Sequence, residues 1–246
     1  FILILLNNLS LIYACPSTGD IPQNYNVYRV CDEIKIPHFL APNYKQRNLQ
    51  TWQQETGHNI PLDHIEEVVY RYSSSMYEAC MKKPQMAQKN KFVQYLATGS
   101  GGAYPKKLLS LAKRVEEARS SKNDPWYYPS SHEDSSTTLD LLLCEANRLE
   151  KDFITNNAAD SFYVKRLQLQ RIRLLFSLGR YADCIELWEN KVQHWDTNEL
   201  MRSMIKDYIA GAYQHLGKET IARQYYLDQG NYQTLAEWSS SRTGNY

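Results

Sequence analysis

Two segments of equal length decide the fold: RLQLQRIRLLFSLGRYADCIELWEN (166–190) and MIKDYIAGAYQHLGKETIARQYYLD (204–228). In both, an apolar pattern of helical period runs into a Leu-Gly pair and resumes beyond it. The two glycines, Gly179 and Gly217, lie 38 residues apart. Glycine adopts the left-handed conformation that ends a helix without steric cost, so each segment predicts two helices joined by a tight turn.

A small residue and an aromatic residue follow each glycine at fixed distances. Cys184 and Ala222 stand five positions after the glycines, and Trp188 and Tyr226 stand four positions further on. A small side chain lets the second helix approach the first closely, and a ring one turn later fills the groove toward the next pair. The segments therefore predict two antiparallel hairpins that stack on each other.

This order of residues resembles the tetratricopeptide repeat, a helix–turn–helix unit that stacks into solenoids. The matching residues are Gly179, Tyr181, Cys184 and Trp188 in the first copy and Tyr213, Gly217, Ala222 and Tyr226 in the second. The likeness covers residues 159–229, with a spacing of 38 residues instead of the family's ~34. The alternative is an ordinary helical bundle in which the two glycines coincide by chance.

Helical periodicity also marks the chain upstream of the hairpins. We expect a short helix over 47–57 and further helices over 60–73, 86–97, 105–122 and 136–154. Asp63 is the expected N-cap of the second of these, with Glu66 completing a capping box. The sequence thus predicts an all-α protein of antiparallel hairpins, stacked as a short tetratricopeptide-like solenoid after an irregular N-terminal segment.

The composition is that of a globular chain without a charge surplus. Of its 246 residues, 28 are Lys or Arg and 27 are Asp or Glu, so the net charge is +1. Proteins that bind polyanions usually concentrate basic residues on one face, so a nucleic-acid partner is not expected.

The first residues, FILILLNNLSLIYA (1–14), are apolar like a secretory signal and too few to span a bilayer. Ile12, Ala14 and Cys15 stand in the order of a bacterial lipobox, which this stretch resembles. The resemblance implies an exported protein of the bacterial cell envelope, with Cys15 lipidated and the membrane contacted only through that anchor. Plain secretion and a buried N-terminal strand are the alternatives.

The expected division of the chain follows from these features: a signal peptide over 1–14, an irregular segment over 15–62 and a helical repeat domain over 63–246.

The remaining cysteines, Cys31, Cys80, Cys144 and Cys184, form no C-x-x-C pair, so neither a zinc site nor thioredoxin-type chemistry is expected. Cys144 and Cys184 lie on apolar helical faces and are expected to be buried free thiols.

Motifs of known catalytic sites are missing from the sequence. The histidines form no H-E-x-x-H pattern, and the GSGG stretch before Lys106 does not continue as the G-x-x-x-x-G-K-[ST] phosphate loop. We therefore expect a protein that is not an enzyme, without catalytic residues, cofactor or metal. An enzyme whose residues meet only in the folded chain is the alternative.

The leading functional hypothesis is a scaffold. Stacked hairpins form a concave surface, and the first helix of each pair offers side chains to a partner protein. Alignment of the two copies makes Gln168, Arg171, Lys206 and Asp207 the candidate surface residues, with Tyr213 near the wall.

A second hypothesis is an envelope glycan-binding module built on an aromatic loop. Trp126, Tyr127 and Tyr128 lie between Pro125 and Pro129, and Trp126 and Tyr128 offer flat rings on which a sugar stacks. The alternative is that the prolines hold these rings against a helix pair.

Overall fold

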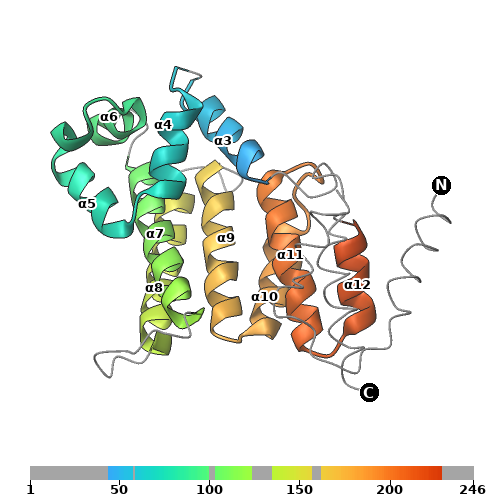
Figure 1. The fold of residues 1–246 in the computed structure, drawn as a ribbon. Helices are drawn as coiled ribbons and strands as arrows, with labels where there is room; N and C mark the ends of the chain where they lie inside the picture. The colour runs from blue at the N-terminus through green and yellow to red at the C-terminus, as the bar shows by residue number, and fades with distance from the viewer. Residues whose placement is uncertain (1–43, 58, 100–102, 124–134, 157–161, 229–246) are drawn as a thin grey trace, which may run out of the picture.

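A computed structural model describes residues 44–57, 59–99, 103–123, 135–156 and 162–228 (Figure 1). All regular structure within these ranges is helical, which confirms the all-α class. Several predictions concern residues outside the described ranges: the signal peptide over 1–14, Cys15, Cys31, Trp126, Tyr127 and Tyr128.

The helices from α7 onward lie side by side in a row (Figure 1). They are α7 (Tyr104–Asn123), α8 (Ser135–Asn156), α9 (Phe162–Ser177), α10 (Tyr181–Leu187), α11 (Leu200–His215) and α12 (Glu219–Asp228). Helix α9 packs on α7, α8, α10 and α11, and α11 packs on α10 and α12. The buried apolar side chains of the described residues form one continuous core, which extends from these helices to those that precede α7.

The helices that precede α7 cover one end of this row (Figure 1). They are α3 (Tyr44–Glu55), α4 (Leu62–Glu66) with a π-helical turn at Glu67–Arg71, α5 (Ser74–Lys82), a 3-10 turn at Pro84–Ala87, and α6 (Lys91–Thr98). Helix α10 likewise continues into a π-helical turn at Trp188–Val192.

Helix α3 is firmly joined to the row, although it lies inside the segment expected to be irregular. Trp52 is 2% exposed and contacts Phe92 of α6 and Phe162 of α9 edge to face. The buried Arg166 of α9 donates through Nη2 to Asn48 Oδ1 at 2.9 Å and to Thr51 Oγ1 at 2.6 Å. The expected boundary at residue 62 therefore does not separate α3 from the helical core.

Polar contacts also link α3 to α11 and to the loop that precedes it. The Tyr44 hydroxyl donates to Asp207 Oδ2 at 2.9 Å, and Arg47 Nη2 donates to the carbonyl oxygen of Asn198 at 3.0 Å. Helix α3 thus spans from α4 to α11 across the ends of the row.

The predicted capping box at Asp63 is wrong. The helix begins at Leu62, because the carbonyl oxygen of Pro61 already accepts the first helical hydrogen bond, from Ile65 N–H. Asp63 lies in the first turn, and Glu66 accepts hydrogen bonds from Lys45 and Arg71.

The helix predicted over 86–97 begins later than expected. Asn90 accepts from the backbone N–H groups of Phe92 and Val93, so it is the N-cap of α6, which starts at Lys91. An asparagine cap satisfies N–H groups that have no partner inside the helix, which the apolar spacing alone did not reveal.

The two glycine turns have the predicted conformation. Gly179 and Gly217 both have φ of 73°. In each turn the following residue closes a Schellman motif: Arg180 N–H donates to Leu175 O and Lys218 N–H donates to Tyr213 O, both at 2.9 Å.

The small residues lie at helix contacts, as predicted. Cys184 and Ala222 are both fully buried, in α10 and α12. Sequence reasoning did not single out Gly211 of α11, where a Cβ would lie 3.0 Å from the Phe176 ring. Three small residues, Cys184, Gly211 and Ala222, therefore allow α9 to α12 to approach closely.

Replacement of Gly179 by alanine should lower the free energy of unfolding by about 1–2 kcal/mol, because an L-residue is strained at positive φ. No other group lies within 4 Å of the added Cβ, so the cost is conformational alone. Urea denaturation measures it. Asparagine, which tolerates this conformation better, should cost less; equal costs for both replacements would contradict the backbone explanation.

Candidate binding groove

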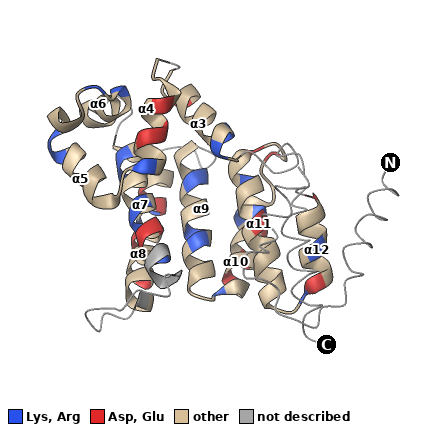
Figure 2. Cartoon of the chain, viewed as in Figure 1, with Lys and Arg blue, Asp and Glu red and all other residues tan. Residues whose placement is uncertain are grey.

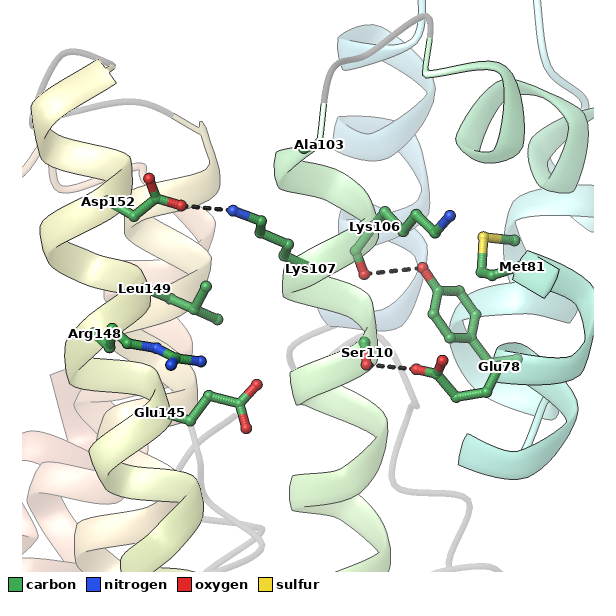
Figure 3. Close-up of a pocket in the computed structure, with 11 residues that line it drawn as sticks. Glu78, Met81, Ala103, Lys106, Lys107, Ser110, Glu145, Arg148, Leu149 and Asp152 are labelled. Atoms are coloured by element: carbon green, nitrogen blue, oxygen red, sulfur yellow. Dashed lines mark hydrogen bonds and ion pairs between the residues drawn. The ribbon is translucent and has the colours of Figure 1, made fainter.

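An open groove of about 660 Å³ lies between α5, α7 and α8 (Figure 3). We call it the α7 groove, because α7 forms its floor. It is lined by Tyr77, Glu78, Met81, Ala103, Lys106, Lys107, Ser110, Glu145, Arg148, Leu149 and Asp152. Its volume lies within the range of sites that hold small ligands or short peptide segments.

Apolar side chains and one tyrosine hydroxyl set the shape of the α7 groove. Tyr77 and Met81 come from α5, and Leu149 comes from α8. The Tyr77 hydroxyl donates to the Lys106 carbonyl oxygen at 3.0 Å, which ties α5 to the first turn of α7. Burial, with the nearby charge of Glu78, raises the pKa of Tyr77, so this hydroxyl stays protonated and keeps donating.

Each carboxylate that lines the α7 groove already has a donor within the chain. Glu78 Oε1 accepts from the Ser110 hydroxyl at 2.6 Å. Asp152 Oδ2 accepts from Lys107 Nζ at 2.7 Å. Arg114 donates to both oxygens of Glu145, at 2.8 and 2.5 Å. These bonds join α5, α7 and α8 and hold the walls of the groove in place.

Two cations that line the α7 groove differ from these carboxylates, because they have no bonded partner among the described residues. Lys106 and Arg148 form no hydrogen bond or ion pair through their side chains with any described residue. In Figure 3 the Arg148 guanidinium extends from α8 toward α7, and the Lys106 ammonium extends from α7 toward α5. The lining of the α7 groove holds three cations and three carboxylates, and Lys106 and Arg148 are the cations that no bond to a described residue holds in place.

A second polar cluster joins α8, α9 and the π-helical turn that follows α10. It is centred on Glu150, whose side chain is 9% exposed. Lys191 Nζ and Gln168 Nε2 donate to Oε1 at 2.5 and 2.6 Å, and Arg171 Nη1 lies 2.8 Å from Oε2. We call these four residues the Glu150 cluster. Arg171 and Lys191 also line a smaller cavity of about 340 Å³.

The Glu150 cluster corrects one expectation about the partner-binding candidates. Gln168 is 2% exposed, so it is a core residue and not a surface residue as predicted. The amide of Gln168 can lie in the core because it donates to the carboxylate of Glu150 on α8. The apolar pattern of one helix cannot reveal this contact between two helices. Arg171 contacts the same carboxylate, so the structure does bring Gln168 and Arg171 together.

The other candidates are also engaged within the chain. Lys206 Nζ lies 3.4 Å from Asp228 Oδ2, and Asp207 accepts from Tyr44. Tyr213 is 8% exposed and packs against Tyr225. Partner binding by these residues stays a prediction, but none of them lines the α7 groove.

Charged residues of both signs lie along the helices of the row and on the covering helices (Figure 2). Sequence reasoning considered Lys106 only as part of a phosphate loop, and Arg148 carried no signal. The pattern of α8 marks Arg148 as exposed, but it does not reveal that α5 folds against α7 beside it. The groove depends on that long-range contact.

The prediction of two buried thiols is half right. Cys184 is buried, and burial raises the pKa of its thiol to about 12. Cys144 is exposed. It falls beside the buried stripe of α8, which consists of Leu139, Leu142, Leu143, Ala146, Leu149 and Phe153.

Within the described ranges, no three His, Cys, Asp or Glu side chains converge as metal ligands. None of the helices found there combines the length and apolar character needed to cross a bilayer. In comparisons with known proteins, no family model, no curated protein and no solved structure matches this chain.

Proposed function

We propose that this protein is a non-enzymatic scaffold of the bacterial cell envelope that holds a partner polypeptide in the α7 groove. The observation that carries the proposal is the groove itself. It is open, its walls are fixed by bonds between three helices, and the side chains of Lys106 and Arg148 form no bond to a described residue.

The proposed architecture is a short tetratricopeptide-like solenoid. It is supported by the identical conformation of the turns at Gly179 and Gly217 and by the buried positions of Cys184 and Ala222. Solenoids of this kind offer extended surfaces on which other chains dock. The proposed anchor is a lipid on Cys15, for which the support is the lipobox-like sequence.

Binding is favoured over catalysis by the state of the polar groups in the groove. The carboxylates of Glu78, Glu145 and Asp152 each hold a neighbouring helix in place. A general acid or base has to exchange protons with a substrate, and these groups are committed to structural bonds. Lys106 and Arg148 can attract a ligand without any change in the fold.

Selection from a library of displayed peptides tests the proposal. Wild-type protein should enrich a set of related peptides, and Lys106→Glu with Arg148→Glu should weaken their binding at least about tenfold. The matched control is Lys89→Glu with Lys91→Glu, which makes the same charge change at exposed positions outside the groove. Enriched peptides that bind both double variants equally would contradict the proposal.

A further inference from the structure

We infer that α3 is a releasable strap: it opens as a unit while α7 to α11 stay folded, and the neutral partners of Arg166 keep it releasable. The strap is separate from the α7 groove, because neither α3 nor Arg166 lines that groove. Helix α3 closes its end of the row through few apolar anchors, and it buries a cation to which no carboxylate is bonded.

Few apolar side chains hold α3 in place. Of its twelve residues, only Leu49 and Trp52 are buried. The polar bonds that Lys45 and Arg47 donate to other elements are exposed, and the bond from Tyr44 to α11 is half-buried. Exposed polar contacts add little to stability, so Leu49 and Trp52 carry most of the attachment.

The cation beneath α3 has no bonded counterion. Arg166 belongs to α9 and is 7% exposed. Its Nη2 donates to Asn48 and Thr51, which are neutral acceptors. Its Nε is buried and has no hydrogen-bond partner among the described residues. Glu199 and Glu55 act on Arg166 through their charges and form no bond to it. Closure of α3 therefore removes a cation from water without pairing it.

This burial opposes the closure of α3. A buried charge loses hydration that neutral acceptors replace only in part. In line with that loss, burial lowers the pKa of the Arg166 guanidinium. When α3 lifts, water reaches the guanidinium, and its contact with the Phe162 ring is kept because both residues belong to α9. The regained hydration offsets part of the contacts that Trp52 loses.

The turn that follows α3 supplies a hinge. Gly57 has φ of 77°, and an added Cβ there would meet nothing closer than the Asn59 side chain at 3.9 Å. Glycine tolerates a wide range of backbone angles, so a rotation at this point moves α3 and leaves α4 in place. Opening uncovers the Phe92 and Phe162 rings, against which Trp52 packs in the closed state.

Hydrogen exchange of the full chain, followed by mass spectrometry, tests the strap. The amides of α3 should exchange at least about tenfold faster than the slowest amides of α9 and α11, because α3 opens without unfolding of the row. If α3 exchanged as slowly as α9 and α11, it would open only together with the whole protein, and the strap would be ruled out.

Asn48→Asp tests the role of Arg166. A carboxylate at this position gives the buried guanidinium a bonded counterion, so the exchange of the α3 amides should slow at least about fivefold. Thr51→Asp places a carboxylate at the other acceptor position and should act in the same direction. The second variant keeps the test valid if the first does not fold, which circular dichroism reveals.

Asn147→Asp is the matched control, because it adds the same charge beside an arginine that already has a carboxylate. Asn147 Oδ1 accepts from Arg171 Nε at 2.9 Å, and Arg171 Nη1 lies 2.8 Å from Glu150 Oε2. This variant should leave the exchange of α3 within about twofold of wild type. If the folded variants at Asn48 and Thr51 did not slow α3, or if the control slowed it as much, the neutral partners of Arg166 would not control the opening and the inference would be overturned.

Discussion

Glu150→Ala should lower the free energy of unfolding by about 3–5 kcal/mol. The substitution leaves the cations of Arg171 and Lys191 and the amide of Gln168 without the carboxylate to which they now bind. Arg171 and Gln168 are largely buried, so water cannot replace the lost bonds. The loss is measured by urea denaturation at pH 7, followed by circular dichroism.

The control for this prediction is Glu150→Gln, which keeps the size and an acceptor oxygen but removes the charge. It should destabilise the protein less than alanine does. An alanine variant with nearly wild-type stability would show that the cluster contributes little to the fold. A loss of the same size in both variants would assign the whole effect to the charge.

The Glu150 cluster also gives a dependence on pH. Burial by itself raises the pKa of Glu150, but the bonds from Lys191 and Gln168 and the charge of Arg171 outweigh it and hold the pKa below its usual value. A glutamate in the unfolded chain titrates near pH ~4.3. The unfolded chain therefore binds this proton at a higher pH than the folded chain does, and the contribution of Glu150 to stability is lost as the pH falls below that value. Wild type should lose stability more steeply than Glu150→Gln below about pH 5, with most of the difference below pH ~4.3.

Trp52→Ala should cost about 3–5 kcal/mol, the range for removing a large buried aromatic side chain. The ring lies 5.6 Å from that of Phe92 and 4.9 Å from that of Phe162, between centroids, and the Arg166 guanidinium lies 5.2 Å from it. Its removal leaves a cavity where α3, α6 and α9 meet. Thermal and urea unfolding measure the loss.

Leu141→Ala is the matched control for Trp52→Ala, because this large apolar side chain is 66% exposed. Its removal should change stability by no more than about 0.5 kcal/mol. If Trp52→Ala cost as little, α3 would not belong to the folded core, and the expected boundary at residue 62 would be restored.

The sequence was most informative where a local rule fixes the backbone. Gly179 and Gly217 were predicted correctly because a helix that ends in a left-handed turn needs glycine, whatever surrounds it. Cys184 and Ala222 followed from their fixed distances to those glycines. The start of α4 was missed because Pro61 supplies the first helical carbonyl, two residues before the expected cap at Asp63.

The candidate site was much less predictable. Gln168 and Arg148 are both polar residues on helices, yet the first is buried and the second is exposed in a groove. What separates them is the neighbouring helix: α8 places Glu150 over Gln168, and α5 forms a wall beside the floor that Arg148 faces. Helical periodicity describes one helix at a time and carries no information on such neighbours.

The attachment of α3 across the helix ends has a mechanical consequence. Tension that enters the chain at Tyr44 meets the hydrogen bond to Asp207 of α11 and, further along α3, the packing of Trp52. The load therefore passes to α11 first and to α6 and α9 next, so a pull on the N-terminal side is carried by helices far along the chain and not by α3 alone.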